Sequence, residues 1–264
     1  MAKRAIKKNQ SDRILNIIPS KKTEEDWTFL TAAASNVIRA IRIPASVDLR
    51  ESWWSIGDQG QTGSCVGWSS VDSVLRWHFT KKGLLKNERL SVRFVWMASK
   101  ETDEFSARPT TFIEEAGTSL KGALDIARKY GCVLEKDLPF NLATQSFDTE
   151  DNFYSKATQF KIRAYYNLHK GDRIVHWKNW LASNGPIFTA LSVDDEWYNA
   201  PKGMLNKYKG PGYGGHAVAI VGYTKDRFII RNSWGTGWGD GGYAYASFAY
   251  AKAAFQESYG IVLP

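Results

Sequence analysis

The hydrophobic period of the chain changes near its middle, and this change restricts the fold more than any other feature. In the first half, apolar residues recur at helical spacing from Val71 to Phe79, and the Lys-Lys-Gly run at 81–83 is typical of a helix end. Residues 91–99 and 120–130 predict two further helices. We therefore expect the first half of the body to be mainly helical.

In the second half the period changes, and short runs separated by Gly, Asn, Asp and Pro are typical of strands. These runs lie at 160–168, 187–193, 216–223, 226–233 and 241–247. One helix over 172–183 interrupts them, with Asp172 as its N-cap. A helical half followed by an antiparallel half predicts an α+β fold of two lobes, and the cleft between them is a natural place for a site.

Basic residues gather at the start of the chain of 264 residues. Residues 1–22 hold seven cations against one acid, and so carry +6 of the net charge of +8. Because the rest is nearly neutral, a solvated basic arm is favoured over a nucleic-acid-binding surface, although the arm could still contact nucleic acid or an anionic membrane.

The body of the protein is predicted at 43–264, after an N-terminal extension over residues 1–42. No apolar run reaches the ~18 residues of a membrane span. The start lacks the apolar core of a Sec signal peptide, so the compartment stays open between the cytoplasm and export by another route.

The chain has two cysteines, Cys65 and Cys132, which is neither a disulfide framework nor a zinc motif. Cys132 follows Gly131 without polar neighbours and is expected to be a buried structural residue. Cys65 follows a turn-rich run at 58–64 and opens a helix, where free N–H groups favour a thiolate. Cys65 is therefore the candidate nucleophile.

Four histidines could serve as its base. His78 lies on the core stripe of the helix that Cys65 opens, His169 in a polar turn, and His176 within a helix beside two tryptophans. His216 follows a glycine-rich run and begins a strand, so it can face a cleft. Asn232, after the next strand, can accept a hydrogen bond from the imidazole and orient it.

These segments together resemble the papain-like cysteine peptidases. NSWGTGWGDGGY is similar to the segment that carries their asparagine, HAVAIVGY to their histidine strand, and DQGQTGSCVGWS to their nucleophile segment, with Gln59 six residues before Cys65. The resemblance covers about 43–264. The family usually has a disulfide-forming cysteine where this chain has Thr62, and an aromatic residue where it has Val66, so this is a divergent, disulfide-free relative.

The resemblance implies a thiolate–imidazolium pair of Cys65 and His216, with no cofactor. It implies that Gln59 helps to hold the oxyanion and that Trp234 shields the bond between His216 and Asn232. Residues expected to line the substrate cleft are Gly63, Gly117, Thr118, Leu120, Ala190, Gly215 and Trp234. Small residues with Leu120 suggest an open apolar pocket, and no preference for basic side chains is expected.

The N-terminal extension, with its apolar patch at 14–18, admits three interpretations: an inhibitory segment lying across the cleft, with residues 14–19 or Trp27 as the plug, a packing strap, or a disordered arm. The predicted partner is a peptide or protein substrate. Two alternatives to peptide hydrolysis remain: a catalytically silent peptide-binding relative, and transpeptidation, deamidation or deubiquitination through the same thioester.

Overall fold

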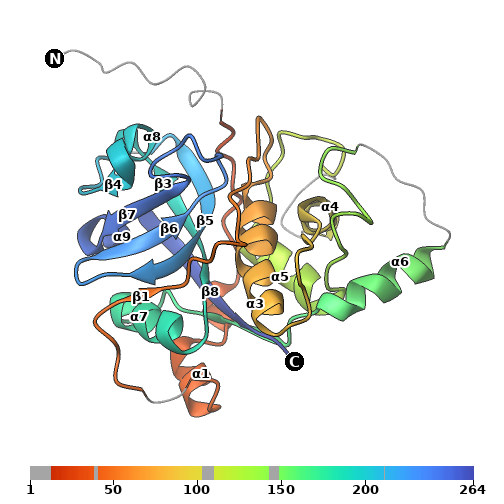
Figure 1. Ribbon diagram of the computed structural model, residues 1–264, viewed down its shortest axis with the longest axis horizontal. Helices are drawn as coiled ribbons and strands as arrows, with labels where there is room; N and C mark the ends of the chain where they lie inside the picture. The colour runs from red at the N-terminus through yellow and green to blue at the C-terminus, as the bar shows by residue number, and fades with distance from the viewer. Residues whose placement is uncertain (1–12, 39–40, 103–109, 143–148, 211) are drawn as a thin grey trace.

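The computed structural model describes residues 13–38, 41–102, 110–142, 149–210 and 212–264. The chain forms two lobes that lie side by side, one helical and one built on a sheet (Figure 1). Within the described residues, no helix has the length and apolarity needed to cross a membrane.

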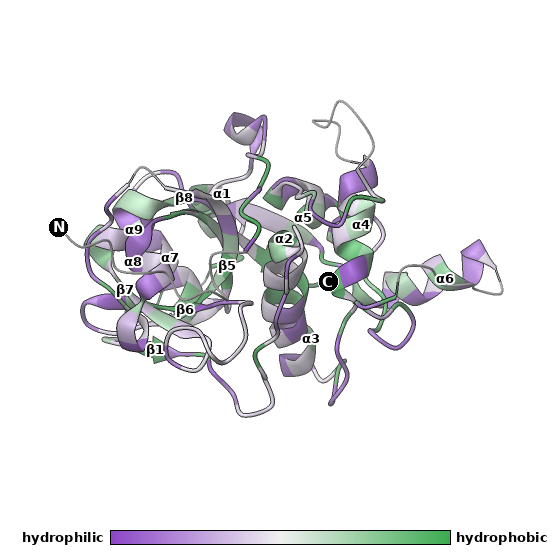
Figure 2. Cartoon of the chain, turned by 90° about the horizontal axis from the view of Figure 1, so that it is seen from above, coloured by the Kyte–Doolittle hydropathy of each residue, from purple (hydrophilic) through white to green (hydrophobic). Residues whose placement is uncertain are grey.

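A long helix begins at Cys65 and runs along the boundary between the lobes as three consecutive pieces, of which the middle one is π-helical. Viewed from above, its pieces α2 and α3 separate the sheet lobe from α4, α5 and α6 (Figure 2). The α-helices and the π-helical segment η2 are α1 (Phe29–Ala34), α2 (Cys65–Gly67), η2 (Trp68–Leu75), α3 (Arg76–Lys81), α4 (Val92–Thr102), α5 (Leu120–Lys129), α6 (Glu150–Ala157), α7 (Arg173–Ser183), α8 (Asp195–Asn199) and α9 (Phe248–Ala254).

The other lobe is a mostly antiparallel sheet in the order β2-β8-β3-β5-β6-β7-β4, with β1 paired to β5. The pair β4–β7 is parallel. The strands are β1 (Val47–Asp48), β2 (Ala164–Asn167), β3 (Ile187–Val193), β4 (Met204–Leu205), β5 (Gly214–Tyr223), β6 (Arg227–Arg231), β7 (Tyr243–Ser247) and β8 (Phe255–Val262). The α+β fold of two lobes predicted from the sequence is confirmed.

Most predicted elements are present with small differences at their ends. Asp172 caps α7, because its side chain accepts a hydrogen bond from the Val175 N–H. In the N-terminal extension, the TEED run at 23–26 is the typical pattern of a helix start. Residues 23–25 form only a 3-10 turn, and α1 begins after Thr28, whose hydroxyl accepts the Thr31 N–H.

Strand β8 was missed, although it pairs with both β2 and β3. Its sequence, FQESYGIV, carries three polar residues in a row and a glycine, so it lacks the alternation of a half-buried strand. Gly260 is required there because a Cβ atom would lie 2.0 Å from the Trp180 ring. Tertiary packing therefore selects the strand where the local pattern does not.

Candidate active site

Cys65 is the first residue of α2 and is fully buried between the lobes. Its sulfur accepts hydrogen bonds from the backbone N–H groups of Ala217 and Val66. Ala217 is the neighbour of His216 on β5, so this contact brings the helix start and the histidine strand together. Burial raises the pKa of the Cys65 thiol to about 11, although these N–H groups oppose the rise.

His216 and Asn232 meet across the β5–β6 pair, in which Ala219 lies opposite Arg231. The His216 Nε2 lies 2.7 Å from the Asn232 Oδ1. Since the amide oxygen only accepts, Nε2 carries the proton and Nδ1 is left with a free lone pair. Nδ1 is buried, and no described residue forms a hydrogen bond with it. The ring therefore keeps a nitrogen with a free lone pair on the strand residue next to Ala217, whose N–H faces the Cys65 sulfur.

Burial of the closed site disfavours the charged forms of both groups. It lowers the pKa of His216 to about 4, with the Asn232 bond opposing this change and the charge of Arg13 adding to it. The thiolate–imidazolium pair expected from the sequence stays a prediction, and desolvation in this closed structure opposes it.

Gln59 is held by a residue that the sequence analysis did not single out. The Ser233 hydroxyl donates to the Gln59 Oε1 at 2.9 Å, which fixes the orientation of the amide. Its Nε2 donates one hydrogen to the Thr62 carbonyl at 3.1 Å, so the second N–H remains for a ligand. Ser233 directly follows Asn232, and this position in the sequence was the one signal that could have indicated a role at the site.

Thr62 closes the turn before Cys65. Its Oγ1 donates to the Gln59 carbonyl at 2.7 Å and lies 2.6 Å from the Ser64 hydroxyl. Both cysteines of the chain are free thiols. Hydroxyl hydrogen bonds therefore hold the turn at the position where the resemblance would place a disulfide cysteine.

Aromatic rings enclose the histidine. The Trp234 ring centroid lies 4.9 Å from that of His216, and the Trp197 centroid lies 5.8 Å away at the edge. Trp238 packs on Trp197 at 4.6 Å. Trp197 was not predicted as a site residue, since α8 is too short to show a helical pattern. The rings keep water from the bond between His216 and Asn232, where a hydrogen bond is stronger.

Residues 13–20, which we call the strap, pass between the two lobes over this site (Figure 1). On the helical side, the Ile18 N–H donates to the Thr118 carbonyl at 3.2 Å, and the Asn16 amide donates to the Glu115 carbonyl. On the sheet side, Asn16 forms a parallel β-bridge with Gly215. Cys65, His216, Gln59 and Asn232 are at most 3% exposed beneath it.

The residues expected to line the cleft lie close to the strap in several cases. A Cβ atom on Gly117 would lie 2.2 Å from the Asn16 carbonyl oxygen, and one on Gly215 would lie 3.2 Å from the Ile17 Cβ. Leu120 and Ala190 are buried at the start of α5 and on β3. Gly63 lies in the turn before Cys65, where its N–H donates to the Glu114 carbonyl.

Glu257 on β8 is an acidic neighbour of this region that was missed together with its strand. It pairs with Ala190, and its Oε1 accepts the N–H of the strap residue Ser20 at 2.9 Å. By contrast, Trp27 is not a plug of the cleft. Its side chain is 59% exposed and its ring contacts Tyr166 on β2. The basic residues before Arg13 lie outside the described part of the chain.

Cys132 and the other histidines lie apart from this arrangement. The Cys132 thiol is buried and donates to the Ser91 and Val133 carbonyls, and burial raises its pKa. The His78 Nε2 is buried, and no hydrogen bond joins it to another residue in the described ranges. His169 contacts the Arg173 guanidinium, and His176 stacks on Phe29.

The chain is similar in sequence to curated cysteine proteinases. A cathepsin L-like proteinase of Fasciola hepatica is 26% identical over 208 residues, 76% of this chain and 59% of the relative. A cysteine proteinase of Theileria parva is 30% identical over 195 residues, 72% of this chain and 39% of the relative. The matched region thus spans less than two thirds of either relative.

Among solved structures, xylellain, a cysteine protease from Xylella fastidiosa, aligns over 99% of this chain and 100% of its own, with a TM-score of 0.76 and 20% identity. Digestive procathepsin L 3 of Tenebrio molitor aligns over 84% of this chain and 71% of its own, with a TM-score of 0.62 and 21% identity. These likenesses show the fold. The profile of the papain family of cysteine proteases matches residues 43–259. The chain therefore belongs to the papain family of cysteine proteases, which are hydrolases.

Proposed function

We propose that the protein hydrolyses peptide bonds through a Cys65 thioester, with His216 as base and acid. The observation that carries this proposal is the 2.7 Å bond from the His216 Nε2 to Asn232, which leaves a free, buried Nδ1 beside the residue that the Cys65 sulfur contacts. Asn232 would hold the ring in the tautomer and orientation that a base needs.

In the reaction, His216 accepts the thiol proton at Nδ1 while the Cys65 sulfur adds to the carbonyl carbon. The carbonyl oxygen becomes an oxyanion that accepts hydrogen bonds from the Cys65 backbone N–H and the free N–H of Gln59. The C–N bond then breaks, and the imidazolium protonates the leaving amine. A water molecule, deprotonated by His216, next adds to the thioester, which releases the acid and restores the thiol.

The strap is proposed to inhibit this reaction by occupying the cleft. It bonds to both walls, at Thr118 and at Gly215, where the backbone of a substrate would otherwise bind. It also excludes water from Cys65 and His216, and so stabilises their neutral forms. We assign Gly63, Gly117, Leu120, Ala190 and Trp234 to the same cleft as substrate contacts.

The test is covalent labelling of the full chain with an epoxide inhibitor of thiol peptidases, followed by mass spectrometry. Cys65 is expected to carry the adduct, faster when the strap is weakened by substitution at Arg13. Cys65→Ala should abolish labelling and turnover, whereas the matched variant Cys132→Ala should retain both.

A peptide library with mass analysis of the products identifies the reaction. Hydrolysis adds one water per cut, while transpeptidation joins two peptides and deamidation leaves the chain intact. Labelling at Cys132, or no labelling of Cys65 in any strap variant, would overturn the proposal.

A further inference from the structure

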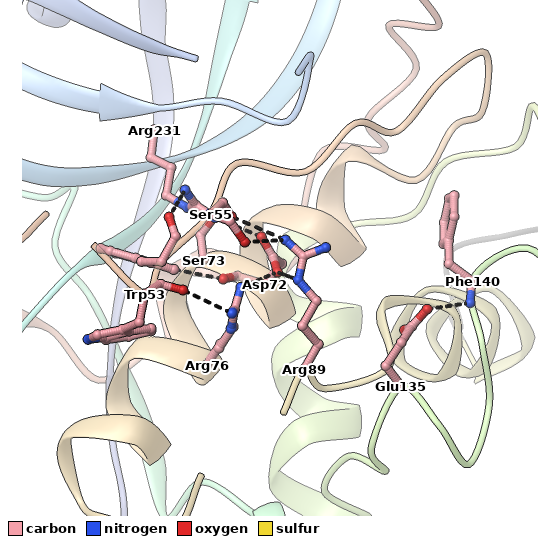
Figure 3. Close-up of polar contacts among 10 residues, drawn as sticks. Trp53, Ser55, Asp72, Ser73, Arg76, Arg89, Glu135, Phe140 and Arg231 are labelled. Carbon is pink, nitrogen blue, oxygen red and sulfur yellow. Dashed lines mark hydrogen bonds and ion pairs between the residues drawn. The ribbon is translucent and has the colours of Figure 1, made fainter. Parts of the chain in front are cut away.

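One buried carboxylate, that of Asp72, lies among three guanidinium groups (Figure 3). The Asp72 Oδ2 lies 2.7 Å from the Arg231 Nη2, and its Oδ1 lies 3.1 Å from Arg76 and 3.3 Å from Arg89. The side chains of Asp72 and Arg231 are 4% and 1% exposed. No step of the proposed reaction uses any of these groups.

The arginines hold the backbone of the segment that leads to Gln59. Arg76 donates to the Trp53 carbonyl at 3.2 Å. Arg231 donates to the Trp54 carbonyl at 3.1 Å and to the Ser55 carbonyl at 2.8 Å. Arg89 donates to the same Ser55 carbonyl at 3.2 Å. Three consecutive peptide groups, close before Gln59, are thus fixed by guanidinium hydrogen bonds, as Figure 3 shows for residues 53 and 55.

The same cluster holds the helix that Cys65 begins. Asp72 and Ser73 belong to η2, the π-helical segment that follows α2. The Arg231 Nε donates to the Ser73 hydroxyl at 3.2 Å, and the Trp54 indole donates to the Asp72 carbonyl at 2.9 Å. π-helical segments are rare and occur mostly at functional sites. We infer that these tertiary hydrogen bonds help to hold η2 in its π-helical geometry.

Arg231 is also the last residue of β6, so the next residue of the chain is Asn232. One side chain therefore links the segments of Gln59, Cys65 and Asn232, which come from both lobes. Its ring contact with Trp54, at 4.7 Å from the centroid, fixes the guanidinium plane further.

Stability alone is a weak reason for such a cluster, since buried ion pairs rarely stabilise a fold more than apolar packing would. Three arginine side chains face the single carboxylate of Asp72. Glu135 is a further acid near them, but its carboxylate accepts the Phe140 N–H and its pKa is raised by burial. A planar guanidinium with five donors is, however, suited to hold several carbonyls at fixed angles.

We propose that Arg231 and Asp72 are positioning residues. They hold Gln59, Cys65 and Asn232 in the relative positions that the reaction requires. The inference rests on the proposed peptidase function. It predicts that kcat falls when the several hydrogen bonds of the Arg231 guanidinium are lost, even if the positive charge at this position is kept.

The test compares Arg231→Lys with Arg227→Lys in the full chain. Arg227 lies on the same strand and also donates to two carbonyls and an asparagine, but away from the site. Arg231→Lys is expected to lower kcat roughly 10- to 100-fold at an almost unchanged KM, because small misplacement of catalytic groups costs that much. Arg227→Lys should stay near the native kcat.

A second readout separates positioning from loss of folded protein. All rates are taken per active site titrated with the epoxide, well below each variant's Tm. Alkylation of Cys65 by iodoacetamide requires the thiolate but neither the Gln59 donor nor a bound peptide, so its rate should change much less than kcat. If Arg231→Lys folds poorly, the nearly isosteric variant Asp72→Asn takes its place. It should likewise lower kcat much more than the rate of Cys65 alkylation.

A native kcat per titrated site in both Arg231→Lys and Asp72→Asn would overturn the inference, as would an equal loss of kcat and alkylation rate. Absence of peptide turnover in the native chain and in its strap variants would instead count against the proposed function itself.

Discussion

Arg13 and Asp58 form a two-pronged ion pair, with N–O distances of 2.5 and 3.2 Å, that joins the strap to the residue directly before Gln59. Arg13 also donates to the Gly60 and Trp234 carbonyls, and its guanidinium lies 5.7 Å from the Trp234 ring centroid. Burial raises the pKa of Asp58, but hydrogen bonds from Arg13 and Gly60 outweigh it and lower the pKa overall. The pair is thus a latch between the strap and the oxyanion side of the cleft.

Breaking this latch should activate the protein. We expect Arg13→Ala to raise kcat/KM for peptides and the rate of Cys65 labelling by about 3- to 30-fold, since a charge-assisted pair of this kind contributes on the order of 1–2 kcal/mol. Arg50→Ala is the matched control, because it breaks an exposed pair with Asp48 outside the cleft. Equal rates for Arg13→Ala and the native chain would contradict inhibition by the strap.

The latch also bears on the titration of His216. The positive charge of Arg13 disfavours the imidazolium, so its removal should raise the pKa of His216 above about 4. More solvent around the ring would raise it further. The imidazole resonances of His216, followed by NMR against pH, measure this change. An unmoved pKa in a variant with raised turnover would show that the strap acts by steric exclusion alone.

Much of the candidate site was predictable because its residues stand in local patterns. Cys65 opens a helix with a clear apolar spacing, His216 lies near the start of the apolar strand β5, and Asn232 directly follows the apolar strand β6. The contacts of the strap were not predictable, because they join residues about 45 to 221 positions apart through single hydrogen bonds. Local periodicity carries no information about such pairs.

The buried charges and the missed strand have a similar explanation. Asp72 lies on a helix face that reads as polar in the sequence, yet it is buried because Arg231 arrives from the other lobe. Strand β8 depends on pairing with β2 and β3 rather than on its own pattern. The burial that shifts the pKa values of Cys65 and His216 against their charged forms is likewise a tertiary effect, which a motif does not show.

Ser233 offers a test of the oxyanion side of the site. Ser233→Ala removes the hydroxyl that holds the Gln59 Oε1, so the amide can rotate and its free N–H loses its direction. We expect kcat to fall roughly 3- to 10-fold with little change in KM, less than the ~10²–10³-fold loss typical when a donor is removed, as in Gln59→Ala. Steady-state kinetics of both variants and of the double variant check this. If Ser233→Ala still lowers kcat in the Gln59→Ala background by the same factor, the hydroxyl acts by another route.

The last prediction concerns stability against pH. His78 on α3 is 8% exposed, and burial, aided by the charge of Lys82, lowers its pKa from 6.5 to about 3. The unfolded chain therefore binds a proton that the folded chain refuses between these two values. Stability should be unaffected above pH 6.5 and should fall as the pH drops below it, by about 2 kcal/mol at pH 5 from this residue.

His78→Leu removes this titration, so its Tm should fall less than that of the native chain between pH 7 and pH 5, by about 4–8 °C. Thermal unfolding followed by circular dichroism at both pH values provides the measurement. Phe79→Leu is the control, because it alters the packing of the same helix without a titrating group, and its cost should be the same at both pH values. If the pH dependence of His78→Leu equals that of Phe79→Leu, then His78 is protonated in the folded protein and its site is more open to water than its burial indicates.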